Sequence, residues 1–88
     1  MGSYRFRVRG RVQGVGYRYF ALKRAEELGL SGFVQNMPDG TVEVIAEGPD
    51  TQLSEFEARL KEGPSFERVE DVERLCLEPR GDRGFHIR

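Results

Sequence analysis

Apolar and charged side chains alternate strictly near the start of the chain, in Tyr4-Arg5-Phe6-Arg7-Val8-Arg9-Gly10-Arg11-Val12. A period of two places the aromatic and aliphatic side chains on one face of an extended segment and the four arginines on the other. Such a pattern predicts a strand that is buried on one side only. Glycines at positions 10, 14 and 16 then interrupt the alternation and indicate a loop.

The spacing of the apolar residues changes after this loop. From Tyr17 to Leu28 they recur every three or four residues, which predicts an amphipathic helix that ends at Gly29. Further on, Pro38-Asp39-Gly40 is typical of a turn between two strands. The remaining elements that we expect are strands over residues 32–36 and 41–48, a helix over 50–62 with Asp50 as its N-cap, a strand over 69–77 and a short strand over 84–88.

This order of elements predicts an α+β two-layer sandwich with the ferredoxin-like βαββαβ topology and a short extra C-terminal strand. Two helices would cover one face of an antiparallel sheet, with the first and third strands in its middle. A chain of 88 residues is expected to form one domain, over residues 1–88. Enzymes, metal chaperones and RNA-binding proteins all use this fold, so the fold alone does not identify the function.

The composition excludes several classes of site. Cys76 is the only cysteine and His86 the only histidine, which rules out an internal disulfide and a metal site rich in either residue. We therefore expect no cofactor and no metal. No apolar segment approaches the roughly 18 residues of a membrane span, and no apolar signal region follows Met1. The default expectation is a cytoplasmic monomer without a membrane partner.

The formal net charge of -1 conceals an uneven distribution of charged residues. Residues 1–25 contain seven basic and no acidic residues, whereas residues 26–88 contain seven basic and all fifteen acidic residues. An anionic ligand is therefore expected at the first quarter of the chain, and the remainder would repel a long polyanion.

The segment Gly10-Arg11-Val12-Gln13-Gly14-Val15-Gly16-Tyr17-Arg18, here called the glycine loop, is suited to bind an anion. Its glycines allow consecutive N–H groups to turn inward into a concave nest, and the positive end of the following helix points to the same place. Arg18 can add a two-pronged guanidinium to a phosphate. The P-loop and dinucleotide-binding motifs do not fit this segment. A glycine-rich turn followed by a surface arginine is the alternative interpretation.

Asn36 is a second candidate, because the topology can place the end of the 32–36 strand at the same sheet edge as the glycine loop. Its uncharged amide donates and accepts hydrogen bonds, so it could hold a water molecule without competing for the proton. The alternative is an asparagine that only starts the turn before Pro38.

Two motifs resemble signatures of the acylphosphatase family. Gly10 to Arg18 matches Gly-x-Val-Gln-Gly-Val-x-aromatic-Arg at every specified position. Gly32 to Glu43 is similar to the family's second signature, Gly-aromatic-Val-x-Asn-x-x-x-Gly-x-Val. The resemblance covers nearly the whole chain from about Tyr4 onward. It implies a ferredoxin-like fold and hydrolysis of the carboxyl-phosphate bond of small-molecule acyl phosphates to a carboxylate and inorganic phosphate.

The resemblance also implies roles for individual residues. Arg18 matches the arginine that binds the phosphoryl group, and Asn36 matches the asparagine that positions the attacking water. The backbone cradle around the phosphate oxygens is matched by Gln13, Gly14, Val15, Gly16 and Tyr17. Because a carboxylate leaves readily, these residues suffice for direct in-line attack by water, and we expect neither a metal nor a phosphoenzyme.

Two other functions stay open at this stage. An RNA-binding module could use the arginines of residues 5–11 as a basic stripe. The aromatic residues of that strand point to the opposite face, however, where they cannot stack on bases beside those charges, so we expect no nucleic-acid partner. A phosphate-sensing module would keep the cradle without turnover. His86 and Cys76 are expected to take no part in either function.

Overall fold

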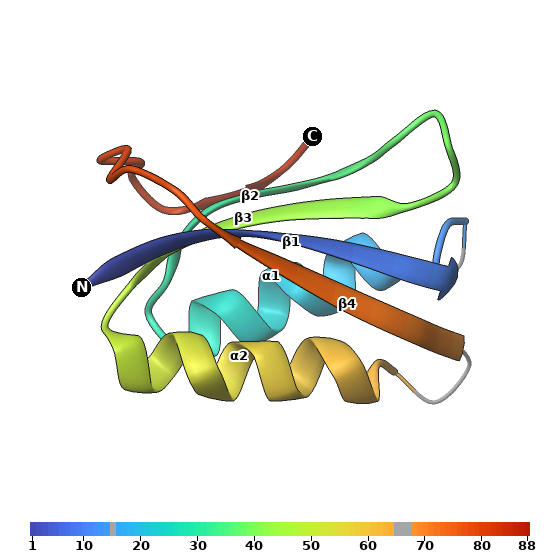
Figure 1. Cartoon of the computed structure of the whole chain (residues 1–88), viewed down its shortest axis with the longest axis horizontal. Coiled ribbons are helices and arrows are strands. Elements are labelled where there is room, and N and C mark those ends of the chain that lie inside the picture. The colour runs from blue at the N-terminus through green and yellow to red at the C-terminus, as the bar shows by residue number, and fades with distance from the viewer. Residues whose placement is uncertain (15, 65–67) are drawn as a thin grey trace.

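The computed structural model describes residues 1–14, 16–64 and 68–88. Two helices pack on one face of a five-stranded sheet, and their shared core lies between the two layers (Figure 1). The elements in chain order are β1 (Gly2–Arg11), α1 (Tyr17–Glu27), β2 (Ser31–Asn36), β3 (Val42–Gly48), α2 (Asp50–Glu62), β4 (Arg68–Cys76) and β5 (Phe85–Ile87).

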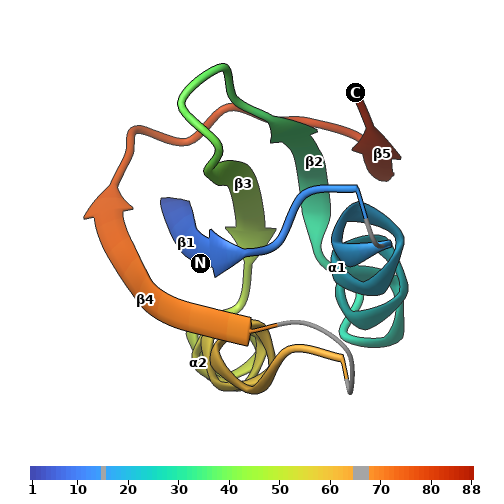
Figure 2. The same cartoon turned by 90° about the vertical axis from the view of Figure 1, so that its right-hand side faces the viewer.

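The strand order is β4-β1-β3-β2-β5, which Figure 2 shows with both helices on the same side of the sheet. β1 pairs antiparallel with β3 and β4, and β3 pairs antiparallel with β2. The predicted ferredoxin-like sandwich and the extra C-terminal strand are confirmed. This extra strand, β5, pairs parallel with β2, so the sheet is mixed and not wholly antiparallel.

The alternation in β1 is confirmed by burial. Phe6 and Val8 are fully buried on the face that packs against the helices, and Val42 and Val44 of β3 are equally buried beside them. The opposite face of the sheet bears no helix and carries the arginines of β1; we call it the open face. Burial of one face only therefore explains the period of two in the sequence.

The predicted start of α2 needs one correction. Pro49, and not Asp50, is the N-cap residue, and no side chain caps the helix there. Asp50 lies in the first helical turn, where its carboxylate faces the positive end of the helix dipole. The two placements differ by one residue because both an N-cap and a first-turn position favour Asp.

At its C-terminal end, α2 is tied to α1 by a buried hydrogen bond. The carbonyl of Leu60 would accept from residue 64 in a continuing helix, but Pro64 has no N–H. The hydroxyl of Tyr17 donates to this carbonyl at 2.7 Å instead. Tyr17 is 1% exposed, so this bond fixes the first residue of α1 within the core.

Neither helix in the described part of the chain has the length and apolar run needed to cross a membrane. Within the same residues, no three side chains of His, Cys, Asp or Glu gather where they could hold a metal ion.

Candidate active site

The glycine loop and the hairpin that joins β2 to β3 meet at one end of the sheet (Figure 2). The contact is made by Gln13, whose side-chain Nε2 donates to the carbonyl oxygens of Met37 and Thr41, both at 2.8 Å. Asn36 is the last residue of β2 and directly precedes Met37. The two predicted halves of the site are thus brought together, although they are distant in the sequence.

The backbone of the glycine loop takes a conformation that requires glycine. Gly14 and Gly16 have φ values of 81° and 92°, in the left-handed region that other residues rarely adopt. Apart from its chain neighbours, no described residue lies within 4 Å of a Cβ atom built at either position, so conformation and not close packing explains these glycines. Val15, which was predicted to belong to the cradle, lies outside the described residues.

The N-terminus of α1 has features that favour an anion. Its N-cap residue is Gly16, which has no side chain to cap the first N–H groups, and its first turn contains no acidic residue. Uncapped N–H groups and the positive end of the helix dipole therefore point toward the loop. A phosphate dianion at this position would accept hydrogen bonds from N–H groups of the first turn and neutralise the dipole.

Arg18, in the first turn of α1, is held by a residue at the far end of the sequence. Its Nη1 donates to the backbone oxygen of Arg88 at 2.9 Å. Arg88 is held in turn by its own N–H, which donates to the carbonyl of Val34 at 2.8 Å, and by its guanidinium, which lies 3.7 Å above the centre of the Phe33 ring. One Nη1 hydrogen is engaged in this way, and the remaining guanidinium N–H groups can still bind an anion.

The side-chain amide of Asn36 is half-buried. Its Oδ1 atom is enclosed and accepts no hydrogen bond within the described residues. An enclosed acceptor without a partner typically destabilises a protein by about 1–3 kcal/mol. Such groups are few in native proteins, and a role in catalysis is one of the explanations for them; in this structure Ser3 Oγ and Arg24 Nε are two others, and neither belongs to the predicted site. This feature separates Asn36 from Gln35, the preceding residue, whose Nε2 donates to Glu43 at 2.8 Å.

The turn after Asn36 is closed by its own hydrogen bonds. Asp39 accepts from the N–H of Thr41 at 3.0 Å and from its hydroxyl at 2.7 Å. The hydroxyl contact, then the backbone N–H and the charge of Arg7, lower the pKa of the Asp39 carboxyl. The turn predicted from Pro38-Asp39-Gly40 is confirmed, and its aspartate is engaged within the turn.

Sequence reasoning assigned Gln13 and Tyr17 only as parts of the backbone cradle. Their side chains prove to be anchors, since Gln13 bonds to the hairpin and Tyr17 to α2. Arg88 was not singled out at all, because its partner Arg18 lies 70 residues away and no local pattern relates the two. Arg88 comes to lie beside α1 through the pairing of β5 with β2, which the sequence did not predict.

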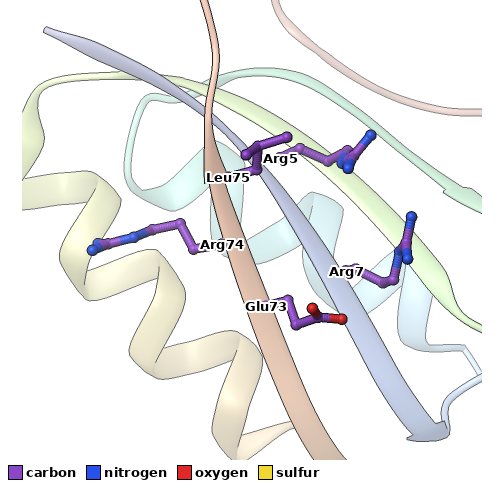
Figure 3. Close-up of a pocket in the computed structure, with 5 residues that line it drawn as sticks. All are labelled: Arg5, Arg7, Glu73, Arg74 and Leu75. Carbon is purple, nitrogen blue, oxygen red and sulfur yellow. The ribbon is translucent and has the colours of Figure 1, made fainter.

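The open face carries the arginines that suggested an RNA-binding stripe. Arg5 and Arg7 line a hollow of about 160 Å³ together with Glu73, Arg74 and Leu75 (Figure 3). Figure 3 shows that the Arg74 side chain turns away toward α2, where it forms an ion pair of 3.2 Å with Glu57. Glu73 forms an ion pair of 3.1 Å with Arg9, so part of the stripe is neutralised by acidic neighbours.

Among the described residues, the aromatic side chain on the open face does not form an exposed platform for bases beside these arginines. Phe33 lies on the open face, but only 6% of it is accessible, because the guanidinium groups of Arg80 and Arg88 cover its ring. His86 is exposed and bonds to the carbonyl of Arg83, while Cys76 is an exposed free thiol at the end of β4. None of these residues lies among the groups described at the glycine loop.

Comparison with known proteins identifies the family. The Acylphosphatase family model matches residues 4–87. An acylphosphatase from Thermus thermophilus is 59% identical over 80 residues, which cover 91% of each chain, and one from Moorella thermoacetica is 46% identical over 83 residues, 94% of this chain and 89% of the other. The crystal structure of acylphosphatase from Bacillus subtilis superimposes with a TM-score of 0.96 at 42% identity, covering 99% of this chain and 98% of that one.

These matches extend over both motifs, the whole sheet and both helices, and they do not favour an RNA-binding or phosphate-sensing module. With the loop, the arginine and the asparagine in the arrangement described above, the chain belongs to the acylphosphatase family of hydrolases.

Proposed function

We propose that the protein hydrolyses acyl phosphates by direct in-line attack of a water molecule on the phosphorus atom. In this mechanism Arg18 and the backbone N–H groups of residues 13–17 hold the phosphoryl oxygens, and Asn36 positions the attacking water. The oxygen of the water forms a bond to phosphorus while the bond from phosphorus to the acyl oxygen breaks. The products are a carboxylate and inorganic phosphate, and one proton of the water passes to a phosphate oxygen.

The observation that carries the proposal is the meeting, at one end of the sheet, of a helix N-terminus that no side chain caps with an amide whose oxygen accepts no hydrogen bond from the described residues. The first provides N–H groups and a positive dipole end for the phosphoryl oxygens. The second, at Asn36, has an oxygen to which no described residue donates a hydrogen bond. Gln13 links the two, since it belongs to the loop and bonds to the residue that follows Asn36.

The residue inventory suits this chemistry because phosphoryl transfer depends mainly on positioning and on stabilising charge at the phosphoryl oxygens. The leaving group is a carboxylate, which does not need protonation to depart at neutral pH. Arg18 and the loop N–H groups supply the positive charge, and an uncharged amide aligns the nucleophile. A general acid or base on the protein is therefore not required by this mechanism.

We extend the proposal to the context of the reaction. The substrate is a small molecule recognised by its phosphoryl end, and the protein works as a single domain and as a monomer, without a nucleic-acid partner. Its one cysteine is an exposed free thiol, which is compatible with a reducing compartment such as the cytoplasm.

The proposal is tested by phosphate release from a synthetic acyl phosphate in the presence of EDTA, with Arg18→Ala beside the wild type. We expect turnover by the wild type and its collapse in the variant. Lys23→Ala serves as a control, because it also removes one positive charge from α1 but at an exposed position one turn further on. Loss of wild-type turnover in EDTA, or isolation of a phosphorylated protein, would contradict the mechanism.

A further inference from the structure

The side-chain amide of Gln13 uses its full donor capacity on the hairpin. A glutamine amide has two N–H hydrogens, and Nε2 lies 2.8 Å from two separate carbonyl oxygens, those of Met37 and Thr41. These partners are 24 and 28 residues away in the sequence, and both contacts are partly buried. The mechanism proposed above uses only the backbone of Gln13, so these two bonds have no role in it.

Both acceptors lie where the two strands of the hairpin meet the turn. The N–H of Met37 donates to Thr41 at 2.9 Å, and the N–H of Gly40 donates to Met37 at 3.1 Å. Each carbonyl therefore accepts one bond from the hairpin itself and a second from Gln13. Loss of the Gln13 donors would leave each carbonyl with one partner, so the hairpin does not depend on Gln13 to close.

The consequence concerns the placement of Asn36. The first acceptor of Gln13 is the carbonyl of Met37, and Met37 directly follows Asn36 in the chain. Because Gln13 itself belongs to the glycine loop, its two bonds hold the backbone that follows Asn36 against that loop. Two bonds to two points resist rotation as well as displacement, whereas a single bond would allow the hairpin to swing.

We propose that Gln13 is a positioning residue that sets the line of attack between the Asn36 amide and the phosphoryl group. This inference rests on the proposed function and deepens it. Binding of the phosphoryl group depends on Arg18 and the loop N–H groups, while the rate of attack depends on alignment of the water. Loss of the Gln13 side-chain bonds therefore lowers kcat and leaves the affinity for phosphate nearly unchanged.

The test is Gln13→Met, which keeps the length of the side chain and removes both donors. A displacement of about 1 Å at a reacting group can reduce a rate by about 10²-fold, so we expect kcat to fall by about 10- to 100-fold. We expect the inhibition constant of inorganic phosphate, and the KM of a synthetic acyl phosphate, to change by less than about threefold. Unchanged kcat, or a loss of phosphate affinity equal to the loss of kcat, would overturn the inference.

Gln35→Met provides the matched control. Gln35 is also a glutamine that makes a 2.8 Å side-chain bond within the sheet, but its partner is the Glu43 carboxylate on the open face. Its loss should leave kcat within about twofold of the wild type, a difference too small to indicate a lost catalytic interaction. If Gln13→Met fails to fold, Gln13→Asn takes its place, since its shorter side chain keeps an amide that cannot reach both carbonyls. The same loss of kcat is expected.

A double-mutant cycle with Asn36→Ala separates positioning from a general structural effect. If Gln13 acts through Asn36, the variant with both changes will turn over no more slowly than Asn36→Ala alone. Multiplicative losses would show that Gln13 acts independently of Asn36 and would refute the inference. Failure of the proposed function is recognised separately, because in that case the wild type gives no turnover or Asn36→Ala retains it.

Discussion

Replacement of Asn36 by alanine should have opposite effects on activity and stability. The Oδ1 atom of Asn36 is enclosed and accepts no hydrogen bond from the described residues, and an acceptor left in that state typically costs a folded protein about 2 kcal/mol. Truncation removes this acceptor but leaves a small cavity in its place, with a cost of about 1 kcal/mol. The expected net result is a gain of about 1 kcal/mol in the free energy of unfolding.

For a domain of this size, 1 kcal/mol corresponds to a rise of about 4–8 °C in Tm. In the same variant, Asn36→Ala, we expect turnover to fall by about 10²-fold, because the attacking water loses the group that aligns it. The inhibition constant of inorganic phosphate should shift by less than about threefold, which is below 1 kcal/mol in binding free energy. The measurements are thermal and urea unfolding, initial rates with a synthetic acyl phosphate, and competitive inhibition by phosphate.

Gln35→Ala is the control for this experiment, since Gln35 is the neighbouring amide on β2 and its Nε2 already has a partner in Glu43. Its truncation should lower stability by about 0.5–1.5 kcal/mol and leave turnover intact. A loss of 1 kcal/mol or more in Asn36→Ala, rather than a gain, would show that Oδ1 is satisfied in the folded protein. Retained turnover in that variant would remove Asn36 from the mechanism.

Three further outcomes follow from the described contacts. Arg18→Ala should lose at least about 10²–10³ in turnover and bind phosphate more weakly, and Arg18→Lys should recover little of either, because an ammonium group cannot make the two-pronged contact; steady-state kinetics decides. Tyr17→Phe should lower the free energy of unfolding by about 1–3 kcal/mol, since it leaves the Leu60 carbonyl buried without a donor, and an unchanged urea midpoint would contradict this. Thr41→Val should raise the pKa of Asp39 toward its ordinary value, as measured by an NMR titration of the carboxyl group. In the wild type, the lowered pKa of Asp39 means that its carboxylate stabilises the fold above the ordinary pKa of aspartate and that this stabilisation is lost as the pH falls below about 4. An unchanged titration of Asp39 in Thr41→Val would refute this role of Thr41.

The parts of the fold that the sequence predicted are those with a local cause. Burial on one face explains the alternation in β1, so it can be read from residues 4–12 without knowing the partners of the strand. Gly29 and Gly63 end the helices where predicted, because positive φ is a property of a single residue. The turn at 37–40 was predictable for the same reason, since proline, aspartate and glycine each act on the backbone beside them.

The contacts that complete the candidate site have no local cause. The partners of Arg18, Gln13 and Tyr17 are backbone oxygens at residues 88, 37 and 60, and every residue type offers a backbone oxygen. A side chain that bonds to a carbonyl therefore leaves no complementary signal in the sequence of its partner. The parallel pairing of β5 was missed for a related reason, because a strand of three residues shows too little alternation to define its register.

These contacts explain how a loop rich in glycine can be ordered enough to act on a phosphoryl group. Glycine allows the left-handed conformations at positions 14 and 16, but it also gives the unfolded loop the greatest freedom to lose. Order must then come from side chains near the glycines that reach other elements. Gln13 reaches the β2–β3 hairpin, Tyr17 reaches α2 and Arg18 reaches the residue after β5, so within the described residues the loop is anchored on both sides of its glycines.

Each anchor leads to an element with a different part in the site or the core. The hairpin carries Asn36, α2 closes the core below the loop, and Arg88 restricts the orientation of the Arg18 guanidinium. Preorganised groups lower the barrier because they need not reorient as charge develops in the transition state. Removal of any one anchor should therefore lower the rate of the reaction by more than the small loss in the free energy of unfolding suggests. The three anchors should differ in whether their removal affects alignment of the attacking water, stability or phosphate binding.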